Sequence, residues 1–262
     1  MPIAITPVAE KGCWSGSTWT IDHEGELAEL IARVAIGQSR TVERILKATG
    51  DLPAGYPKGG FQGARTLLTV GNGDKTYHRD GWVFQVIAWI AAHRFDEDAL
   101  IRSPQMIKAD KGLDGLMIEF DDNGIAQVVI CEEKATEHPR QKIKSQVWPE
   151  FEQFETGARD NELVASVTSL LEKSDDADPD RTVADILWNE KRAYRVSVTV
   201  GDKHASEKGR KRLFAGYEKR VLGDVERRRA ETLVLEDVRE WLDKIAEMAL
   251  AAIEDAEADS LV

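Results

Sequence analysis

Residues 111–136 read KGLDGLMIEFDDNGIAQVVICEEKAT, two apolar runs separated by a polar turn. The turn, Asp121–Gly124, ends in Asn-Gly, a pair that supplies the positive φ angles of a tight hairpin. Neither run alternates strongly between apolar and polar residues, which is typical of strands covered on both faces. The stretch therefore predicts a hairpin within a sheet that is flanked by helices.

Charged residues gather where the second run ends, at Glu132-Glu133-Lys134. Because successive side chains on a strand point to opposite faces, Glu132 and Lys134 should project together and Glu133 the other way. Asp114 stands at the start of the neighbouring run, so we expect it beside this pair. A register slip of one residue would turn Glu133 inward and remove Lys134 from the group.

These residue types suit a metal site. Two carboxylates that converge from neighbouring strands, Asp114 and Glu132, can hold Mg²⁺ or Mn²⁺, which prefer hard oxygen ligands. Such an ion can activate water and stabilise charge that builds on a phosphate. Lys134 could position the attacking water or stabilise pentavalent phosphorus. The alternative interpretation is a solvated strand end, with Asp114 in a turn.

The spacing of Asp114, Glu132 and Lys134 resembles the motif of the PD-(D/E)xK nuclease superfamily. The resemblance covers residues 80–200 by element order, although Leu113 stands where many members have proline. It implies a restriction-endonuclease-like core of a helix, a three-stranded sheet, a helix and a further strand. It also implies a metal-dependent nuclease with these three catalytic residues, of which the two acids bind the metal.

Further polar residues are secondary candidates for the site. Relatives of this type carry a glutamine on the helix after the lysine strand, and Gln146 falls at a matching place. They also place an acid or amide on a helix before the hairpin, for which Gln85, Glu29 or Glu26 could serve. Each of these residues could equally have a purely structural role.

The wider arrangement resembles the nuclease subunits of bacterial antiphage systems, in particular the Hachiman nuclease family. An N-terminal helical portion precedes the Lys-Gly-hydrophobic-Asp sequence of residues 111–114, and the acid-x-Lys sequence of residues 132–134 follows. This resemblance implies DNA cleavage with little sequence specificity. It also implies a helicase partner that restrains the nuclease until DNA damage or infection.

The charge of the chain is uneven. The formal net charge is −12, which argues against a nucleic-acid platform over the whole surface. Between Lys203 and Arg229, however, ten Lys or Arg stand against four acids, whereas residues 230–262 hold two against ten. This basic strip could contact backbone phosphates, or it could be a solvated helix face. The candidate phosphate-binding residues are Lys208, Arg210, Lys211 and Arg212.

Cysteine and hydropathy patterns exclude other classes. Cys13 and Cys131 are the only cysteines, so the chain has no disulfide framework and no zinc spacing. No stretch approaches the ~20 apolar residues of a membrane helix, and the N-terminus lacks the pattern of a signal peptide. We therefore expect a cytoplasmic protein.

Apolar periodicity predicts the remaining elements. Helices are expected at 24–48 (one or two), 80–95, 139–154, 161–173, 206–222 and 236–258. Asp80 is expected to cap the second of these regions, and Pro149 to kink or divide the third. A strand is expected at 194–200, with shorter strands at 67–70 and 232–235. Residues 50–65 should be loop, and residues 1–22 irregular or a strand.

These elements predict an α/β fold with a mixed sheet of four or five strands. We expect an N-terminal helical and loop portion, 1–79, packed on a nuclease core, 80–262, in a single compact unit.

Two other functions remain open on the sequence. A non-catalytic subunit could use the same fold to bind a protein partner, with the three site residues incidental. An acidic mimic of DNA would fit the net charge but not the basic strip. The catalytic interpretation requires Asp114, Glu132 and Lys134 to come within reach of one ion.

Overall fold

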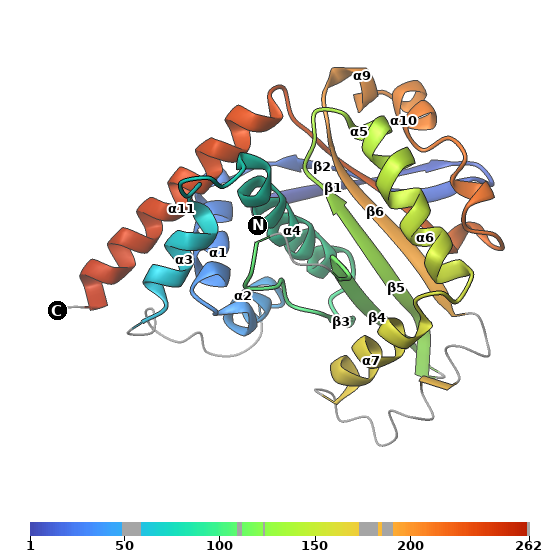
Figure 1. Ribbon diagram of the computed structural model, residues 1–262, viewed down its shortest axis with the longest axis horizontal. Coiled ribbons are helices and arrows are strands. Elements are labelled where there is room, and N and C mark those ends of the chain that lie inside the picture. The colour runs from blue at the N-terminus through green and yellow to red at the C-terminus, as the bar shows by residue number, and fades with distance from the viewer. Residues whose placement is uncertain (49–58, 109–111, 123, 173–182, 185–190, 261–262) are drawn as a thin grey trace.

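One mixed β-sheet of seven strands organises the computed structural model of the protein, which describes residues 1–48, 59–108, 112–122, 124–172, 183–184 and 191–260 (Figure 1). The strands are β1 (Ile3–Glu10), β2 (Trp14–Ile21), β3 (Leu100–Ile101), β4 (Gly115–Asp121), β5 (Gly124–Lys134), β6 (Arg192–Val200) and β7 (Arg228–Val234). Their order is β1-β2-β7-β6-β5-β4-β3. The four central strands, β2, β7, β6 and β5, are parallel, and antiparallel pairs flank them on both sides.

The predicted hairpin is confirmed as β4 and β5. Asp121 pairs with Gly124, so the connection has two residues, of which Asn123 lies outside the described part of the chain. The predicted strand at 194–200 is confirmed as β6, which lies parallel to β5. The sheet therefore places the end of β5 beside the ends of β4 and β6.

The sheet has more strands than the predicted four or five. The additional strands include β1 and β2, which come from the region expected to be irregular or a strand. Gly16 explains the close fit of β2 against β7, because a Cβ at this residue would lie 1.9 Å from the carbonyl oxygen of Ala230. A polar strand of small residues such as β2 carries little sequence signal, and its partner β7 is 214 residues away along the chain.

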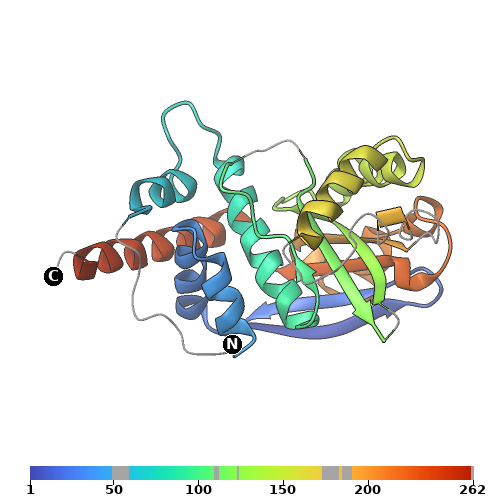
Figure 2. The ribbon, with the colours of Figure 1, turned by 90° about the horizontal axis from the view of Figure 1, so that it is seen from below.

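Helices cover both faces of the sheet, as Figures 1 and 2 show. One face carries α4 (Thr76–Phe95), and around it pack α1 (Glu24–Ala35), α2 (Ser39–Leu46), α3 (Phe61–Leu68) and α11 (Val238–Ser260). The other face carries α5 (Pro139–Lys142), the π-helical turn Ile143–Val147, α6 (Trp148–Glu155), α7 (Asp160–Leu171) and α10 (Glu207–Leu213), which follows the short α9 (Asp202–Ala205). The N-terminal 79 residues thus supply two strands of the common sheet and three helices that pack on α4 and α11.

Two elements differ from their predictions for identifiable reasons. The strand expected at 67–70 is wrong, because Leu67 and Leu68 belong to α3, which begins at Phe61 inside the predicted loop. Helix α4 begins at Thr76, so Asp80 lies inside it and is not its cap. Asp80 is instead fully buried between the guanidinium groups of Arg79 and Arg239.

The helix predicted at 139–154 is confirmed, and it contains a π-helical turn rather than a break. Pro149 follows this turn and has no N–H to donate to the carbonyl of residue 145. A π-turn widens the helix by one residue, and such turns occur frequently at functional sites. This turn carries Gln146 on the side of the sheet where β5 ends.

The basic helix expected at 206–222 is shorter than predicted. Helix α10 ends at Leu213 and 3₁₀ turns follow it at Tyr217–Lys219 and Val225–Arg227. In the part of the chain that the structure describes, no helix has the length and apolar composition needed to cross a lipid bilayer.

Candidate active site

Three charged side chains meet where β5 ends beside the start of β4. The Nζ of Lys134 lies 2.5 Å from Oδ2 of Asp114 and 2.6 Å from Oε2 of Glu132. Glu132 and Lys134 project from the same face of β5, as alternation along a strand requires. The structure thus brings together the three residues that the sequence predicts for the site.

The two carboxylates of this group differ in their surroundings. The side chain of Glu132 is 1% exposed, whereas that of Asp114 is 29% exposed. Burial raises the pKa of Glu132 well above its usual range, although the ammonium of Lys134 opposes this shift. Asp114 and Glu150 (on α6) add repulsion that raises the pKa further. The site therefore contains one deeply buried acid that needs positive charge and one acid that faces solvent.

Lys134 supplies part of that positive charge. Burial alone would lower the pKa of its ammonium, but the charges of Glu132 and Asp114 outweigh burial and raise it above the ordinary range for lysine. Lys134 consequently stays protonated near neutral pH. It can donate hydrogen bonds or stabilise negative charge, but it cannot act as a general base there.

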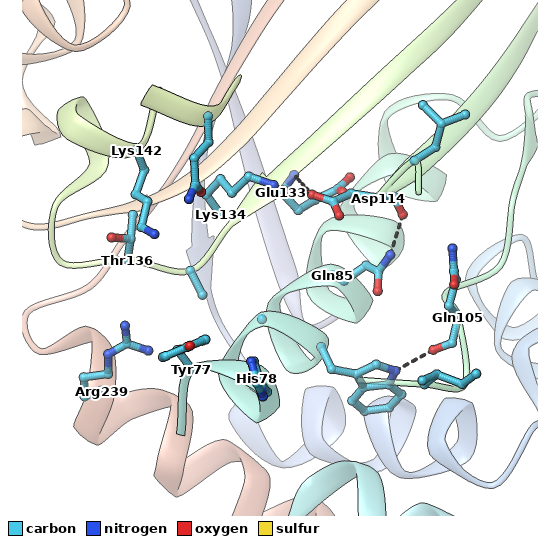
Figure 3. Close-up of a pocket in the computed structure, with 16 residues that line it drawn as sticks. Tyr77, His78, Gln85, Gln105, Asp114, Glu133, Lys134, Thr136, Lys142 and Arg239 are labelled. Atoms are coloured by element: carbon cyan, nitrogen blue, oxygen red, sulfur yellow. Dashed lines mark hydrogen bonds and ion pairs between the residues drawn. The ribbon is translucent and has the colours of Figure 1, made fainter. Parts of the chain in front are cut away.

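Asp114 is held in place from three sides. The amide of Gln85 on α4 donates to its main-chain carbonyl, as Figure 3 shows. The main-chain N–H of Glu133 donates to its Oδ2 at 3.3 Å. Arg102, just after β3, donates to the neighbouring carbonyl of Leu113 at 2.5 Å. These contacts position the loop before β4, which has no regular structure of its own.

Glu133 lies on the opposite face of β5, beneath α4. Its Oε2 is buried and receives no hydrogen bond from the described residues. Burial raises the pKa of Glu133 to about 8, with Asp114 adding to the shift and Arg195 opposing it. Gly115 on β4 makes room for this side chain, because a Cβ there would lie 3.1 Å from Oε1 of Glu133. The predicted register is thus observed, and the second acid is accommodated as a buried group.

The donor set fits a divalent cation. Glu132 has a buried Oε2 that lies 2.6 Å from the Lys134 ammonium but receives no hydrogen bond of good geometry. Because Asp114 Oδ2 and Glu132 Oε2 both contact Nζ, the two oxygens can be no farther apart than these two short distances laid end to end. Two oxygens bound to one Mg²⁺ at ~2.1 Å lie at most ~4.2 Å apart, so a small movement brings them to one ion. Among the described residues no group of three His, Cys, Asp or Glu could hold a metal, so water would complete the coordination.

Two surface depressions meet at these residues. One has a volume of about 520 Å³ and lies between α4, α5 and the end of β5. The other has a volume of about 680 Å³ and lies between α6, α7 and the loop before β4. Asp114, Lys134 and Gln146 line both of them. We name the first depression the α4 cleft; Figure 3 shows its lining side chains.

The secondary candidates divide into two groups. Gln85 and Gln146 lie at the site, since both line the α4 cleft. Glu29 and Glu26 do not line either depression. Glu29 forms an ion pair with Arg33 on the surface of α1, and Glu26 lies 3.4 Å from the N-terminal amino group. On helix α1 these acids face away from the sheet, because its apolar stripe faces inward.

The basic strip lies outside the two depressions. Helix α10 contacts α5, because the guanidinium of Arg140 donates to the carbonyl of Leu213 at 2.8 Å. Lys211 forms an ion pair with Glu10. None of the four predicted phosphate-binding residues lines either depression, namely Lys208, Arg210, Lys211 and Arg212.

Other residues of the site were not predicted. Tyr77, Lys142 and Arg239 line the α4 cleft, and Glu150 lies in the second depression beside Glu132. Arg239 begins the long α11, more than 100 residues after the hairpin, so its position depends on tertiary packing. Lys142 follows the site lysine by eight residues on a predicted helix, which is the one local signal among the four.

Comparison of the chain with known protein families, with curated proteins and with solved structures found no match.

Proposed function

We propose that this protein is a metal-dependent nuclease that hydrolyses phosphodiester bonds in DNA, with little sequence specificity and a restriction-endonuclease-like core. The observation that carries the proposal is the placement of the Lys134 ammonium between Asp114 and Glu132, at the point where two surface depressions meet. A buried acid, an exposed acid and a protonated lysine around one point suit an anionic substrate bound with a divalent cation.

Each residue has a distinct role in this proposal. Asp114 and Glu132 would hold Mg²⁺ or Mn²⁺, which supplies Lewis-acid stabilisation of phosphate charge and lowers the pKa of bound water. Lys134 would donate to a phosphate oxygen or to the attacking water, because its raised pKa keeps it a donor. Gln85 positions Asp114 through the main chain and does not touch the substrate.

The reaction is a hydrolysis. The oxygen of water forms a bond to phosphorus, the bond from phosphorus to one ester oxygen breaks, and the departing oxygen gains a proton. The ammonium of Lys134 remains charged throughout and stabilises negative charge on the phosphate, in the way that preorganised donors do in other active sites. Backbone phosphates reach this site without base contacts, which is why we expect little base specificity.

The test is cleavage of plasmid and linear DNA by purified protein with Mg²⁺ or Mn²⁺. Glu132→Gln and Asp114→Asn keep the shapes of the side chains and remove one charge each, so we expect both to lose cleavage. Glu29→Gln is the matched control, because it removes an acid that lies away from the site. Thermal unfolding of each variant shows whether it remains folded.

Cleavage that survives in both site variants would exclude this role for the carboxylates. If the wild type does not cut, the assay is repeated with the product of the neighbouring gene. We propose that such a partner is a helicase of an antiphage system, on the resemblance of residues 111–114 and 132–134; Lys111 lies outside the described residues. Continued inactivity with that partner would favour a non-catalytic binding subunit.

A further inference from the structure

The α4 cleft has two chemically different ends (Figure 3). Asp114, Gln85 and Gln105 line one end. Lys142, Arg239 and Tyr77 line the other, and Lys134 lies between the two ends. The proposed chemistry uses the first end, so the second end has no role in bond cleavage.

Lys142 gives the second end uncompensated positive charge. This lysine is half-buried on α5 at the edge of the cleft. Among the described residues no carboxylate forms an ion pair with its ammonium, in contrast to Lys108, Lys134, Lys211 and Lys244, each of which has an acidic partner. A partly desolvated lysine without a counter-charge attracts an anion.

Arg239 is fixed beside it. Its Nη1 donates to Oδ2 of Asp80, a carboxylate that is 0% exposed and whose other oxygen binds Arg79. Its Nε lies 3.5 Å from Glu137, whose side chain is 57% exposed. Within the described residues no acceptor binds its Nη2, and a third of the side chain is open to the cleft. The buried aspartate therefore holds the guanidinium in one orientation, as recognition of phosphate by arginine requires.

The rim of this cleft is apolar. Tyr77 is 50% exposed and Ile107 is 66% exposed, and both line the cleft. The Tyr77 ring packs edge-to-face against His78 at a centroid distance of 4.5 Å, which holds it at the rim. Exposed aromatic rings beside cationic groups bind the bases of single-stranded nucleic acid, whereas a duplex hides the faces of its bases.

We propose that this end of the α4 cleft binds an unpaired nucleotide of the substrate strand. The phosphate of this nucleotide contacts Lys142 and Arg239, and its base contacts Tyr77. The proposal rests on the proposed function and narrows its substrate to nucleic acid that is single-stranded beside the cleavage point. The volume of about 520 Å³ lies within the ~300–1,000 Å³ of small-molecule pockets. Gly81 adds space, because a Cβ there would meet no atom within 4 Å.

The test is binding of a fluorescent single-stranded oligonucleotide, measured by anisotropy in EDTA so that no cleavage occurs. We expect Tyr77→Leu to weaken binding about tenfold, within the range for loss of one stacked base. Tyr77→Phe keeps the ring and should bind as the wild type does. Arg239→Gln should reduce the slope of log affinity against log salt by about 0.7, the value for one phosphate contact of a single strand.

Lys244→Gln is the matched control for Arg239→Gln. It removes one positive charge from the same helix, where Lys244 pairs with Glu24 on the surface. We expect this control to leave both affinity and salt slope unchanged. A duplex of the same sequence should bind more weakly than the single strand and should not respond to Tyr77→Leu. An RNA of the same sequence shows whether the site requires deoxyribose.

Single-strand binding that ignores both Tyr77→Leu and Arg239→Gln would overturn the proposal. It would also be overturned if the wild type cuts duplex DNA with Mg²⁺ but does not bind the single strand, and the nuclease assignment would then stand. If the variants lose binding as expected and yet Mg²⁺ and Mn²⁺ produce no cleavage, the nucleotide site stands and the nuclease assignment fails.

Discussion

Glu132 and Glu133 are neighbours in sequence, yet their carboxylates are buried on opposite faces of β5. Glu132 faces Lys134 and the two depressions, and Glu133 faces α4 and the buried pair Arg195–Glu231. One strand end thus inserts a carboxylate into each of two layers of the molecule. In both layers burial raises the pKa, but only Glu132 has a cation within 3 Å.

We expect the stability of the metal-free protein to fall as pH rises from about 4.5 to about 8. The folded state raises the pKa of Glu133 to about 8 from an ordinary 4.5, so it binds a proton more tightly than the unfolded chain. Stability from this group is complete below the unfolded pKa and is lost as pH rises through the folded pKa, by up to ~1.4 kcal/mol per pH unit. Glu132 contributes in the same direction.

The measurement is urea unfolding in EDTA at pH 5, 7 and 9, for the wild type and for Glu133→Gln. The neutral amide should flatten the pH profile and be more stable than the wild type at pH 9. A variant profile as steep as that of the wild type would contradict the buried environment of Glu133.

Loss of the Lys134 ammonium should destabilise the fold as well as the reaction. Lys134→Met leaves Glu132 and Asp114 facing each other without positive charge, and breaking a buried ion pair costs ~3 kcal/mol or more. Adding Glu132→Gln removes the stranded charge, so the double variant should regain most of that stability without regaining cleavage. Urea unfolding of the four proteins of the cycle measures this coupling, and additive effects would show that the two side chains do not interact.

Divalent metal should stabilise the wild type. Binding to the native state alone raises stability by ~2.7 kcal/mol when the metal stands at 100 times its Kd. We expect Mn²⁺ to raise the thermal midpoint of the wild type and to leave those of Glu132→Gln and Asp114→Asn almost unchanged. Glu29→Gln should respond as the wild type does, and an equal shift in all four proteins would place the metal elsewhere.

Two glycines should respond oppositely to alanine. Gly81 lies within α4 and a Cβ there meets nothing, so Gly81→Ala should stabilise the protein by ~0.5–1 kcal/mol. Gly16→Ala places a Cβ 1.9 Å from a main-chain oxygen of β7, so β2 must move away and the protein should lose several times as much stability. Urea unfolding ranks the two variants. If Gly16→Ala is neutral, β2 and β7 do not pack as closely as described.

The parts of the protein that were predictable from sequence depend on local spacing. The hairpin follows from Asn-Gly between two apolar runs, and the meeting of Glu132 with Lys134 follows from the period of two along β5. The nearness of Asp114 follows from the antiparallel partner strand. These relationships span about two dozen residues, so one sequence contains all the information needed to infer them.

The parts that were not predictable depend on distant packing. Strand β2 is polar and becomes a strand because β7, 214 residues later, covers its edge. Leu67 and Leu68 resemble a short strand, but their neighbours in α1 and α11 favour a helix. Asp80 resembles a helix cap until Arg239 arrives from the other end of the chain. The binding end of the α4 cleft depends on that same contact.

The pairing of β2 with β7 also affects the protein during its synthesis. The ribosome produces β2 among the first residues, and β7 emerges only after more than 200 others. Until then the centre of the sheet lacks a strand, and the Arg195–Glu231 pair beneath β5 is incomplete. Such long-range contacts fold slowly and leave strand edges open to other chains. A nascent chain of this protein therefore depends on protection from aggregation, and it completes the support beneath its candidate active site only when translation is nearly finished.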